Sequence, residues 1–144
     1  MYKLRRKGVV CIAYASKPIR YLLLHRKLHW TGWEIIKGGS LARERMENTV
    51  KRELKEETGL KAVSCKRFPV RGSFIYDKKT QRQRKARGFS YQLFACEVKK
   101  GRIRIGKREH DGYKWCTYSQ AARLLTWPNQ RQYLRAVDKF VKKH

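Results

Sequence analysis

The chain reads Gly38-Gly-Ser-Leu-Ala-Arg-Glu44 and, after seven further residues, Arg52-Glu-Leu-Lys-Glu-Glu-Thr-Gly-Leu60. This segment, residues 38–60, holds five of the 11 acidic residues of the protein. Between residues 46 and 58 the composition is typical of a helix, with Val50 and Leu54 four residues apart on one face. The glycine that follows stands where helices commonly end. We therefore predict a helix over residues 46–58 that docks on a sheet through its apolar face.

Three glutamates of this predicted helix are spaced so that their carboxylates share one face. Glu53, Glu56 and Glu57 stand at positions i, i+3 and i+4. Carboxylates gathered in this way repel one another unless a cation lies among them. Mg²⁺, a hard ion that prefers oxygen ligands, would suit such a group. The alternative is an ordinary solvated helix face whose glutamates pair with bases such as Lys51 and Arg52.

The net charge is extreme for a chain of this size. The 144 residues suit one domain, and 41% of them are apolar, which is enough for one core. Lys and Arg number 37 against 11 Asp and Glu, which gives a net charge of +26. Pairing within the protein cannot absorb that excess, so we expect a polyanionic partner. No apolar run approaches the roughly 20 residues of a membrane-spanning helix, and we predict a cytoplasmic protein with no membrane partner and no leader segment.

The rest of the sequence predicts one α/β (α+β) domain over residues 1–144. Apolar runs rich in β-formers predict strands, the first two of them as a hairpin, and two later segments predict helices. The expected strands are 9–14, 21–24, 62–76, 88–98, 103–105 and 112–117, and the expected helices are 120–125 and 129–142. Helices interspersed in a mixed set of strands favour a layered domain.

The four cysteines, Cys11, Cys65, Cys96 and Cys116, stand far apart in the sequence with no Cys-x-x-Cys pair. We predict that all four are packed thiols in a reducing compartment.

Residues 38–60 resemble the signature of the Nudix hydrolases at all nine of its defined positions: glycine, glutamate, Arg-Glu, an aliphatic, Glu-Glu, glycine and an aliphatic. The resemblance implies an α/β/α sandwich around a mixed central sheet. It implies a loop–helix–loop that binds Mg²⁺ or Mn²⁺. It also implies hydrolysis of the pyrophosphate link in a nucleoside diphosphate that is joined to another group.

The same resemblance assigns roles to individual residues. It makes Glu53, Glu56 and Glu57 metal ligands, one of which also serves as the general base. Gly38 would let the backbone approach the metal closely. Arg52, with Glu44 beside it, would hold a carboxylate in place through its forked guanidinium.

Segments outside residues 38–60 are similar to the asymmetrical diadenosine tetraphosphate hydrolase branch of that family. They are His29-Trp30, Lys37 with the adjoining Gly38, the stretch from Glu109 to Trp115 and the tail from Tyr118 to Phe140. The resemblance makes Glu109 a further metal ligand or base, Lys37 a phosphate contact, and Tyr76 and Tyr113 aromatic partners of a base. A solvated acid, a surface lysine and strand-packing aromatics are the plainer alternatives.

Three positions depart from that branch. Ile36 replaces the usual proline before Lys-Gly, and Ala42 and Arg43 replace a usual Pro-Gly pair. These changes weaken the case for diadenosine tetraphosphate as substrate more than the case for hydrolysis.

A basic segment, residues 77–87, separates two of the predicted strands, and we predict a loop there. It carries six bases: Lys78, Lys79, Arg82, Arg84, Lys85 and Arg87. A dinucleotide needs fewer positive charges than this protein has, so the loop favours RNA contact. Three functions follow: hydrolysis of a dinucleoside polyphosphate, pyrophosphate removal or decapping at an RNA 5′ end, or non-catalytic binding to RNA or the ribosome. The intact carboxylate set favours an enzyme.

Overall fold

One mixed sheet organises the protein. The computed structural model describes residues 2–144, and its strands lie in the order β3-β2-β1-β6-β5, with β4 paired to β1 and β7 to β2. β1 and β6 are parallel, whereas the other pairs are antiparallel. The bounds are β1 Arg5–Ala15, β2 Arg20–Arg26, β3 Gly32–Glu34, β4 Ile36–Gly39, β5 Ala62–Ile75, β6 Gly88–Val98 and β7 His110–Cys116.

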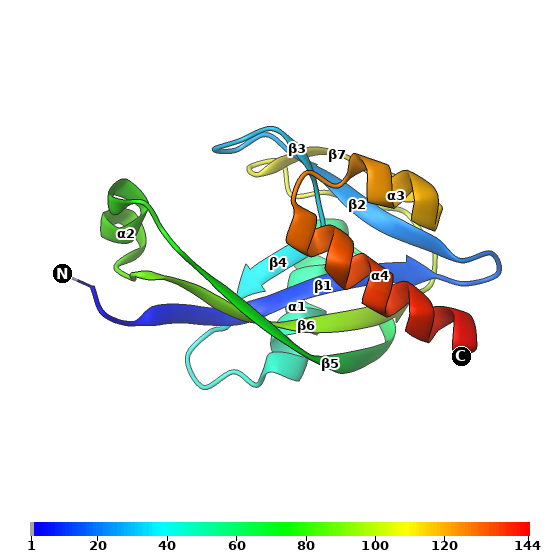
Figure 1. Ribbon diagram of the computed structural model, residues 1–144, viewed down its shortest axis with the longest axis horizontal. Helices are drawn as coiled ribbons and strands as arrows, with labels where there is room; N and C mark the ends of the chain where they lie inside the picture. Colours follow the sequence, from blue (N-terminus) through cyan, green and yellow to red (C-terminus); the bar gives the residue numbers. More distant parts are fainter. Residues whose placement is uncertain (1) are drawn as a thin grey trace.

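Helices cover both faces of this sheet, as Figure 1 shows. They are α1 Met46–Thr58, α2 Lys78–Arg84, α3 Tyr118–Leu124 and α4 Pro128–Lys143. Alternate residues of β1 serve the two cores: Val9 packs in the core with α1, and Val10 in the core with α3 and α4. The predicted α/β/α sandwich with a mixed central sheet is confirmed.

Helix α1 has the bounds that the sequence predicts. Val50 and Leu54 are fully buried against the sheet. The helix ends because Gly59 adopts a left-handed conformation, with φ of 76°, and its N–H bonds to the Lys55 carbonyl. The apolar stripe therefore fixes which way the glutamate face points.

The predicted loop over residues 77–87 is wrong, because most of it forms α2. The Asp77 side chain accepts a hydrogen bond of 2.7 Å from the Thr80 N–H, which caps the helix, and Lys85 ends it with φ of 51°. Figure 1 shows α2 at the end of the β5–β6 hairpin, close to the N-terminus. Asp77 is thus the start signal that explains the helix.

Smaller differences concern the later part of the chain. Residues 103–105, predicted as a strand, are irregular. Helix α3 begins earlier than predicted because Thr117 caps it in a capping box with Gln120. Among the described residues no helix is both long and apolar enough to cross a bilayer.

The prediction of four free thiols is also wrong. Cys65 and Cys96 form a disulfide between β5 and β6, since they lie directly opposite in the antiparallel register. Cys11 and Cys116 are buried free thiols, as predicted.

Candidate active site

Glu53 lies against the backbone of β4. A Cβ on Gly38 would collide with the carboxyl group of Glu53, so glycine at this position lets that carboxyl group lie directly on the β4 backbone. The Glu53 side chain is buried. Burial, together with the neighbouring charges of Glu56 and Glu57, outweighs the contact with Arg52 and raises the pKa of Glu53 to about 7.

Arg52 ties the carboxylates together. Its Nε and Nη2 donate to the two oxygens of Glu44 at 2.9 and 2.8 Å, and its Nη1 donates to Glu53 at 2.9 Å and Glu56 at 3.2 Å. The paired bonds from Arg52, with further bonds from Leu41 and Thr49, lower the pKa of Glu44 to about 2. Arg52 and Glu44 therefore hold the Glu53 carboxylate in one orientation.

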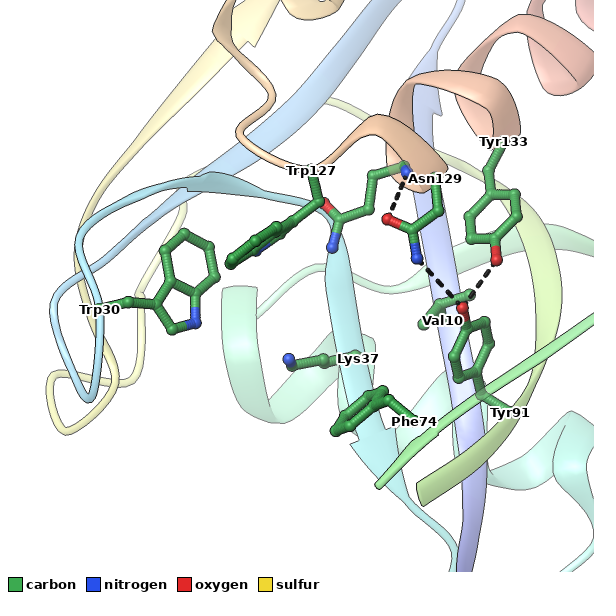
Figure 2. Close-up of a pocket in the computed structure, with 9 residues that line it drawn as sticks. Val10, Trp30, Lys37, Phe74, Tyr91, Trp127, Asn129 and Tyr133 are labelled. Carbon is green, nitrogen blue, oxygen red and sulfur yellow. Dashed lines mark hydrogen bonds between the residues drawn. The ribbon is translucent and has the colours of Figure 1, made fainter. Parts of the chain in front are cut away.

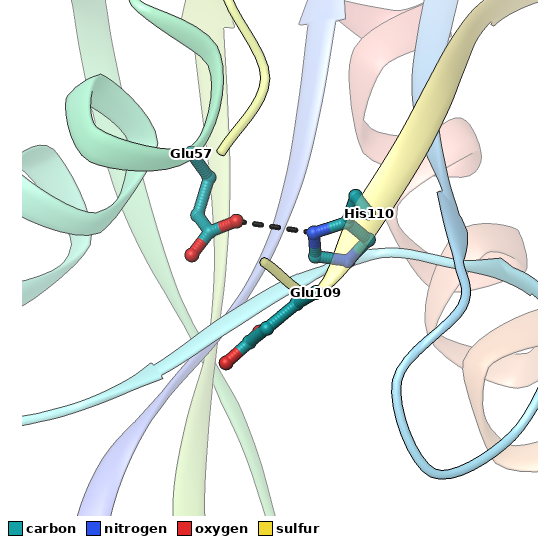
Figure 3. Close-up of side chains that lie close together, drawn as sticks. All are labelled: Glu57, Glu109 and His110. Carbon is teal, nitrogen blue, oxygen red and sulfur yellow. Dashed lines mark ion pairs between the residues drawn. The ribbon is translucent and has the colours of Figure 1, made fainter. Parts of the chain in front are cut away.

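Glu57 of α1 lies close to two residues where β7 begins. Ligating atoms of Glu57, Glu109 and His110 lie within 4.8 Å of one another (Figure 3). His110 Nδ1 is 3.2 Å from Glu57 Oε2, yet within residues 2–144 neither buried atom has a well-aligned hydrogen bond. A buried carboxylate oxygen without such a bond, next to a second carboxylate, is the donor set that a hard divalent ion requires. The two carboxylates, Glu57 and Glu109, therefore fit a metal.

A buried ionic cluster contacts these carboxylates, and its residues were not predicted as a group from the sequence. Glu34 is fully buried, with its Oε2 3.0 Å from Arg26 Nη1 and 2.7 Å from His110 Nε2. Burial raises the pKa of Glu34, but His110, Lys37 and Arg26 outweigh it and hold that pKa below its ordinary value. Burial lowers the pKa of His110, but its contacts with Glu34 and Glu57 raise it to about 9. The signal in the sequence was one glutamate between apolar residues, which needs a cationic partner when buried.

The carboxylates and several bases line one cleft of about 510 Å³. Of the residues predicted for the site, the cleft gathers Lys37, Gly38, Glu53, Glu56, Glu57, Tyr76, Arg84 and Glu109. It is also lined by Arg6 and Arg26, which the prediction did not include. The arrangement places acids that can hold a metal in the same cleft as bases that can hold phosphate.

Other predicted residues lie elsewhere. Tyr113 is 46% exposed on β7, outside the residues that line the cleft. Arg52 and Glu44 lie behind the cleft wall. The predicted bases other than Arg84 are exposed around α2 without lining the cleft: Lys78, Lys79, Arg82, Lys85 and Arg87.

An aromatic pocket of about 320 Å³ adjoins the cleft and shares Trp30, Lys37 and Phe74 with it. Figure 2 shows Trp30 and Trp127 on one side, with ring centroids 5.1 Å apart, and Phe74 beside Lys37. The Tyr91 hydroxyl, bonded to Tyr133 at 2.7 Å, lies at the inner end. Lys37 lines both the aromatic pocket and the cleft. Burial lowers the pKa of its ammonium group.

Fold and cleft define an α/β/α protein in which one helix presents a set of glutamates to a cleft that is also lined by bases. A family model described as NUDIX domain matches residues 4–137. An RNA pyrophosphohydrolase of Stutzerimonas stutzeri (strain A1501) is 30% identical over 114 residues, which cover 72% of this chain and 72% of that protein. The chain belongs to the NUDIX domain family, and within it is a hydrolase that acts on pyrophosphate bonds.

Solved structures share the fold. An Ap4A hydrolase of C. elegans in a binary complex has a TM-score of 0.69 at 19% identity, covering 97% of this chain and 100% of that chain. The NUDIX domain of NrtR from Shewanella oneidensis, complexed with ADP ribose, has a TM-score of 0.77 at 14% identity, covering 97% of this chain and 90% of that chain.

Proposed function

We propose that this protein is a Mg²⁺-dependent pyrophosphohydrolase of a nucleoside polyphosphate. The observation that carries the proposal is the cleft that is lined both by four acids, Glu53, Glu56, Glu57 and Glu109, and by the bases Lys37 and Arg84. The carboxylates are suited to bind Mg²⁺ (or Mn²⁺), and a bound ion of this kind neutralises phosphate charge and the charge that develops on the leaving oxygen.

The residues around the cleft divide the remaining work. Lys37 and Arg84 orient the phosphates and offset their charge. Glu53 serves as general base: Arg52 holds its Oε1, which leaves Oε2 to accept the proton of the attacking water. A carboxylate that lines the cleft can take a proton from a water molecule hydrogen-bonded to it, which is the role of a general base.

The aromatic pocket supports a nucleoside as the group attached to the phosphates. A base placed between Trp127 and Phe74 would leave its phosphates to pass Lys37 into the cleft. Stacking on aromatic rings is worth about 1–3 kcal/mol per base. A dinucleoside polyphosphate such as diadenosine tetraphosphate is the first candidate substrate.

An RNA 5′ end is the second candidate, and the bases around α2 favour it. All six are exposed at the rim of the molecule, and Arg84 also lines the cleft. The bacterial relative named as an RNA pyrophosphohydrolase supports the same candidate. In this proposal the 5′ phosphates occupy the cleft and the following nucleotides run past α2.

A substrate panel with Mg²⁺ tests the proposal. It comprises dinucleoside polyphosphates, ADP-ribose, oxidised nucleotides and 5′-triphosphate RNA, with the products resolved by chromatography. We expect hydrolysis of at least one member and its loss in EDTA. Inactivity on every member together with tight RNA binding would favour the non-catalytic function instead.

The base pocket has its own test. Replacing Trp127 by Ala removes a stacking wall that contacts substrate before and during the reaction, so we expect KM to rise roughly tenfold with little change in kcat. Tyr113→Ala is the matched control, because Tyr113 is as exposed as Trp127 (46% against 43%) but lies outside both hollows. A larger KM effect at Tyr113 would place the base elsewhere.

A further inference from the structure

We infer that Glu34 is a positioning residue that sets the spacing between Glu57 and Glu109. The inference rests on the proposed function, because it concerns the metal-binding carboxylates of the same cleft. Glu34 itself does not line the cleft.

Glu34 lies where β3 ends and β4 is about to begin, in the middle of the sheet. Its side chain is 1% exposed, and its Oε2 contacts both Arg26 Nη1 and His110 Nε2. Its Oε1 has Lys37 Nζ 3.7 Å away and, among the described residues, no hydrogen-bond partner. Burying a carboxylate this deeply costs folding free energy unless cations surround it, so we expect Glu34 to have a functional role.

Two bridges lead from Glu34 to the cleft. Through His110 it reaches Glu57 on α1, with 2.7 Å on one side of the imidazole and 3.2 Å on the other. Through Arg26 it reaches Glu109, which lies just before β7, at 3.0 and then 3.6 Å. Glu34 is therefore the shared partner of Arg26 and His110, and each of these also contacts one acid of the cleft.

This geometry explains how acids from distant segments come to share a metal. Glu57 and Glu109 are 52 positions apart in the chain and belong to different elements. Without the Glu34 carboxylate, Arg26 and His110 would lose the contact that fixes where their side chains lie. Glu57 and Glu109 would then lose the partners that hold them at a fixed spacing, and metal binding would weaken.

The test compares Glu34→Gln with wild type and with a matched control. Glu47→Gln removes a glutamate from an exposed ion pair with Arg67, 3.0 Å long, outside the cleft. The first readout is Mn²⁺ binding to the free protein, followed by the electron paramagnetic resonance signal of the unbound ion. The second is the Mg²⁺ concentration for half-maximal turnover. Loss of such an outer partner typically weakens metal affinity or activity about 10–100-fold.

We expect Glu34→Gln to weaken Mn²⁺ binding roughly tenfold or more and to raise the Mg²⁺ requirement in parallel. KM for the nucleotide at saturating Mg²⁺ should stay near the wild-type value. Glu47→Gln should match wild type in every readout. Glu34→Asp, which keeps the charge on a shorter side chain, should fall between wild type and Glu34→Gln, and it carries the test if Glu34→Gln does not fold.

Wild-type Mn²⁺ affinity in folded Glu34→Gln or Glu34→Asp would overturn the inference, even if either variant were less stable. Failure of the proposed function has a different signature. In that case wild type binds Mn²⁺ but hydrolyses nothing in the panel, and the effect of Glu34 on Mn²⁺ binding is still measurable.

Discussion

Gly38 makes room for Glu53, the carboxylate that we propose as the general base. Its missing side chain is what allows Glu53 to lie on the β4 backbone. We therefore expect Gly38→Ala to displace Glu53 and lower kcat by roughly 10²-fold, a loss comparable to that of other oriented electrostatic groups. Gly101→Ala is the control, because a Cβ there meets the nearest atom, a Leu60 methyl carbon, at an ordinary 3.8 Å. Equal activity of the two variants would contradict the placement of Glu53.

The raised pKa of Glu53 has a consequence for stability in EDTA. In the unfolded chain the carboxyl ionises near pH 4.5, whereas in the folded protein its pKa is about 7. The folded state therefore holds a proton that the unfolded state releases, and this contribution to stability is complete below about pH 4.5 and lost as the pH rises through 7. The side chain at this position does not ionise in Glu53→Gln, so that variant does not lose this stability as the pH rises.

We accordingly predict that Glu53→Gln gains stability relative to wild type between pH 5 and pH 8, by about 1–3 kcal/mol. Urea unfolding of both proteins in EDTA at the two pH values measures it. The pH profile of an exposed control, Glu47→Gln, should follow wild type. A stability difference that stays constant with pH would show that Glu53 ionises normally.

Among the helices and strands, sequence periodicity predicted the bounds most accurately where the local pattern and the tertiary packing agree. Helix α1 has an apolar stripe, a terminal glycine and a sheet to dock on, and its predicted bounds match. Helix α2 has no buried residue, so the apolar pattern that reveals helices was missing, and the Asp77 cap was the one local signal. The pairing of Cys65 with Cys96 depends on strand register, which their spacing in the sequence does not reveal.

The residues of the site also divide into those that a local pattern reveals and those that only the folded sheet brings together. Glu53, Glu56 and Glu57 could be grouped from helical spacing, and Glu109 and Lys37 from family resemblance. Glu34, Arg26 and His110 could not, because β2, β3 and β7 meet only through sheet pairing. Tyr113 alternates to the exposed side of its strand, and strand alternation cannot tell which face the substrate uses.

Helix α2 carries the prediction that separates the two substrate candidates. Replacing the six bases Lys78, Lys79, Arg82, Arg84, Lys85 and Arg87 by Gln preserves helix propensity and removes the charge. Each phosphate contact contributes roughly −0.7 to the slope of log affinity against log salt for single-stranded RNA. If most of the six touch RNA, the slope flattens by several units, whereas dinucleotide turnover loses only the phosphate contact that Arg84 provides in the cleft. The measurement is RNA binding across a salt series.

A second six-fold variant controls for net charge. It replaces exposed bases away from the cleft, namely Lys61, Lys99, Arg102, Arg135, Lys139 and Lys143. We expect it to keep most of the wild-type slope. If the slope of log affinity against log salt flattened equally in both variants, RNA binding would depend on the overall charge and not on the bases around α2.

At the scale of the whole molecule, the protein concentrates its few acids at one place. Net charge of +26 draws polyanions to the surface generally, yet Glu53, Glu56, Glu57 and Glu109 converge on one cleft. A binding platform gains nothing from acids at the spot where phosphate arrives, whereas a metal-dependent hydrolase needs them there. The distribution of charge therefore supports catalysis more strongly than the total charge supports binding.

Turnover of the best panel substrate as a function of Mg²⁺, by wild type and by Glu57→Gln, tests this account most directly. Glu57→Gln keeps the size of the side chain and removes one charge from the group that includes Glu109 and His110. Wild-type turnover should rise to saturation with Mg²⁺ and vanish in EDTA, and Glu57→Gln should be slower by roughly 10²-fold or more while remaining folded. Turnover that persists in EDTA, or a Glu57→Gln rate close to wild type, would contradict a metal-dependent active site in this cleft.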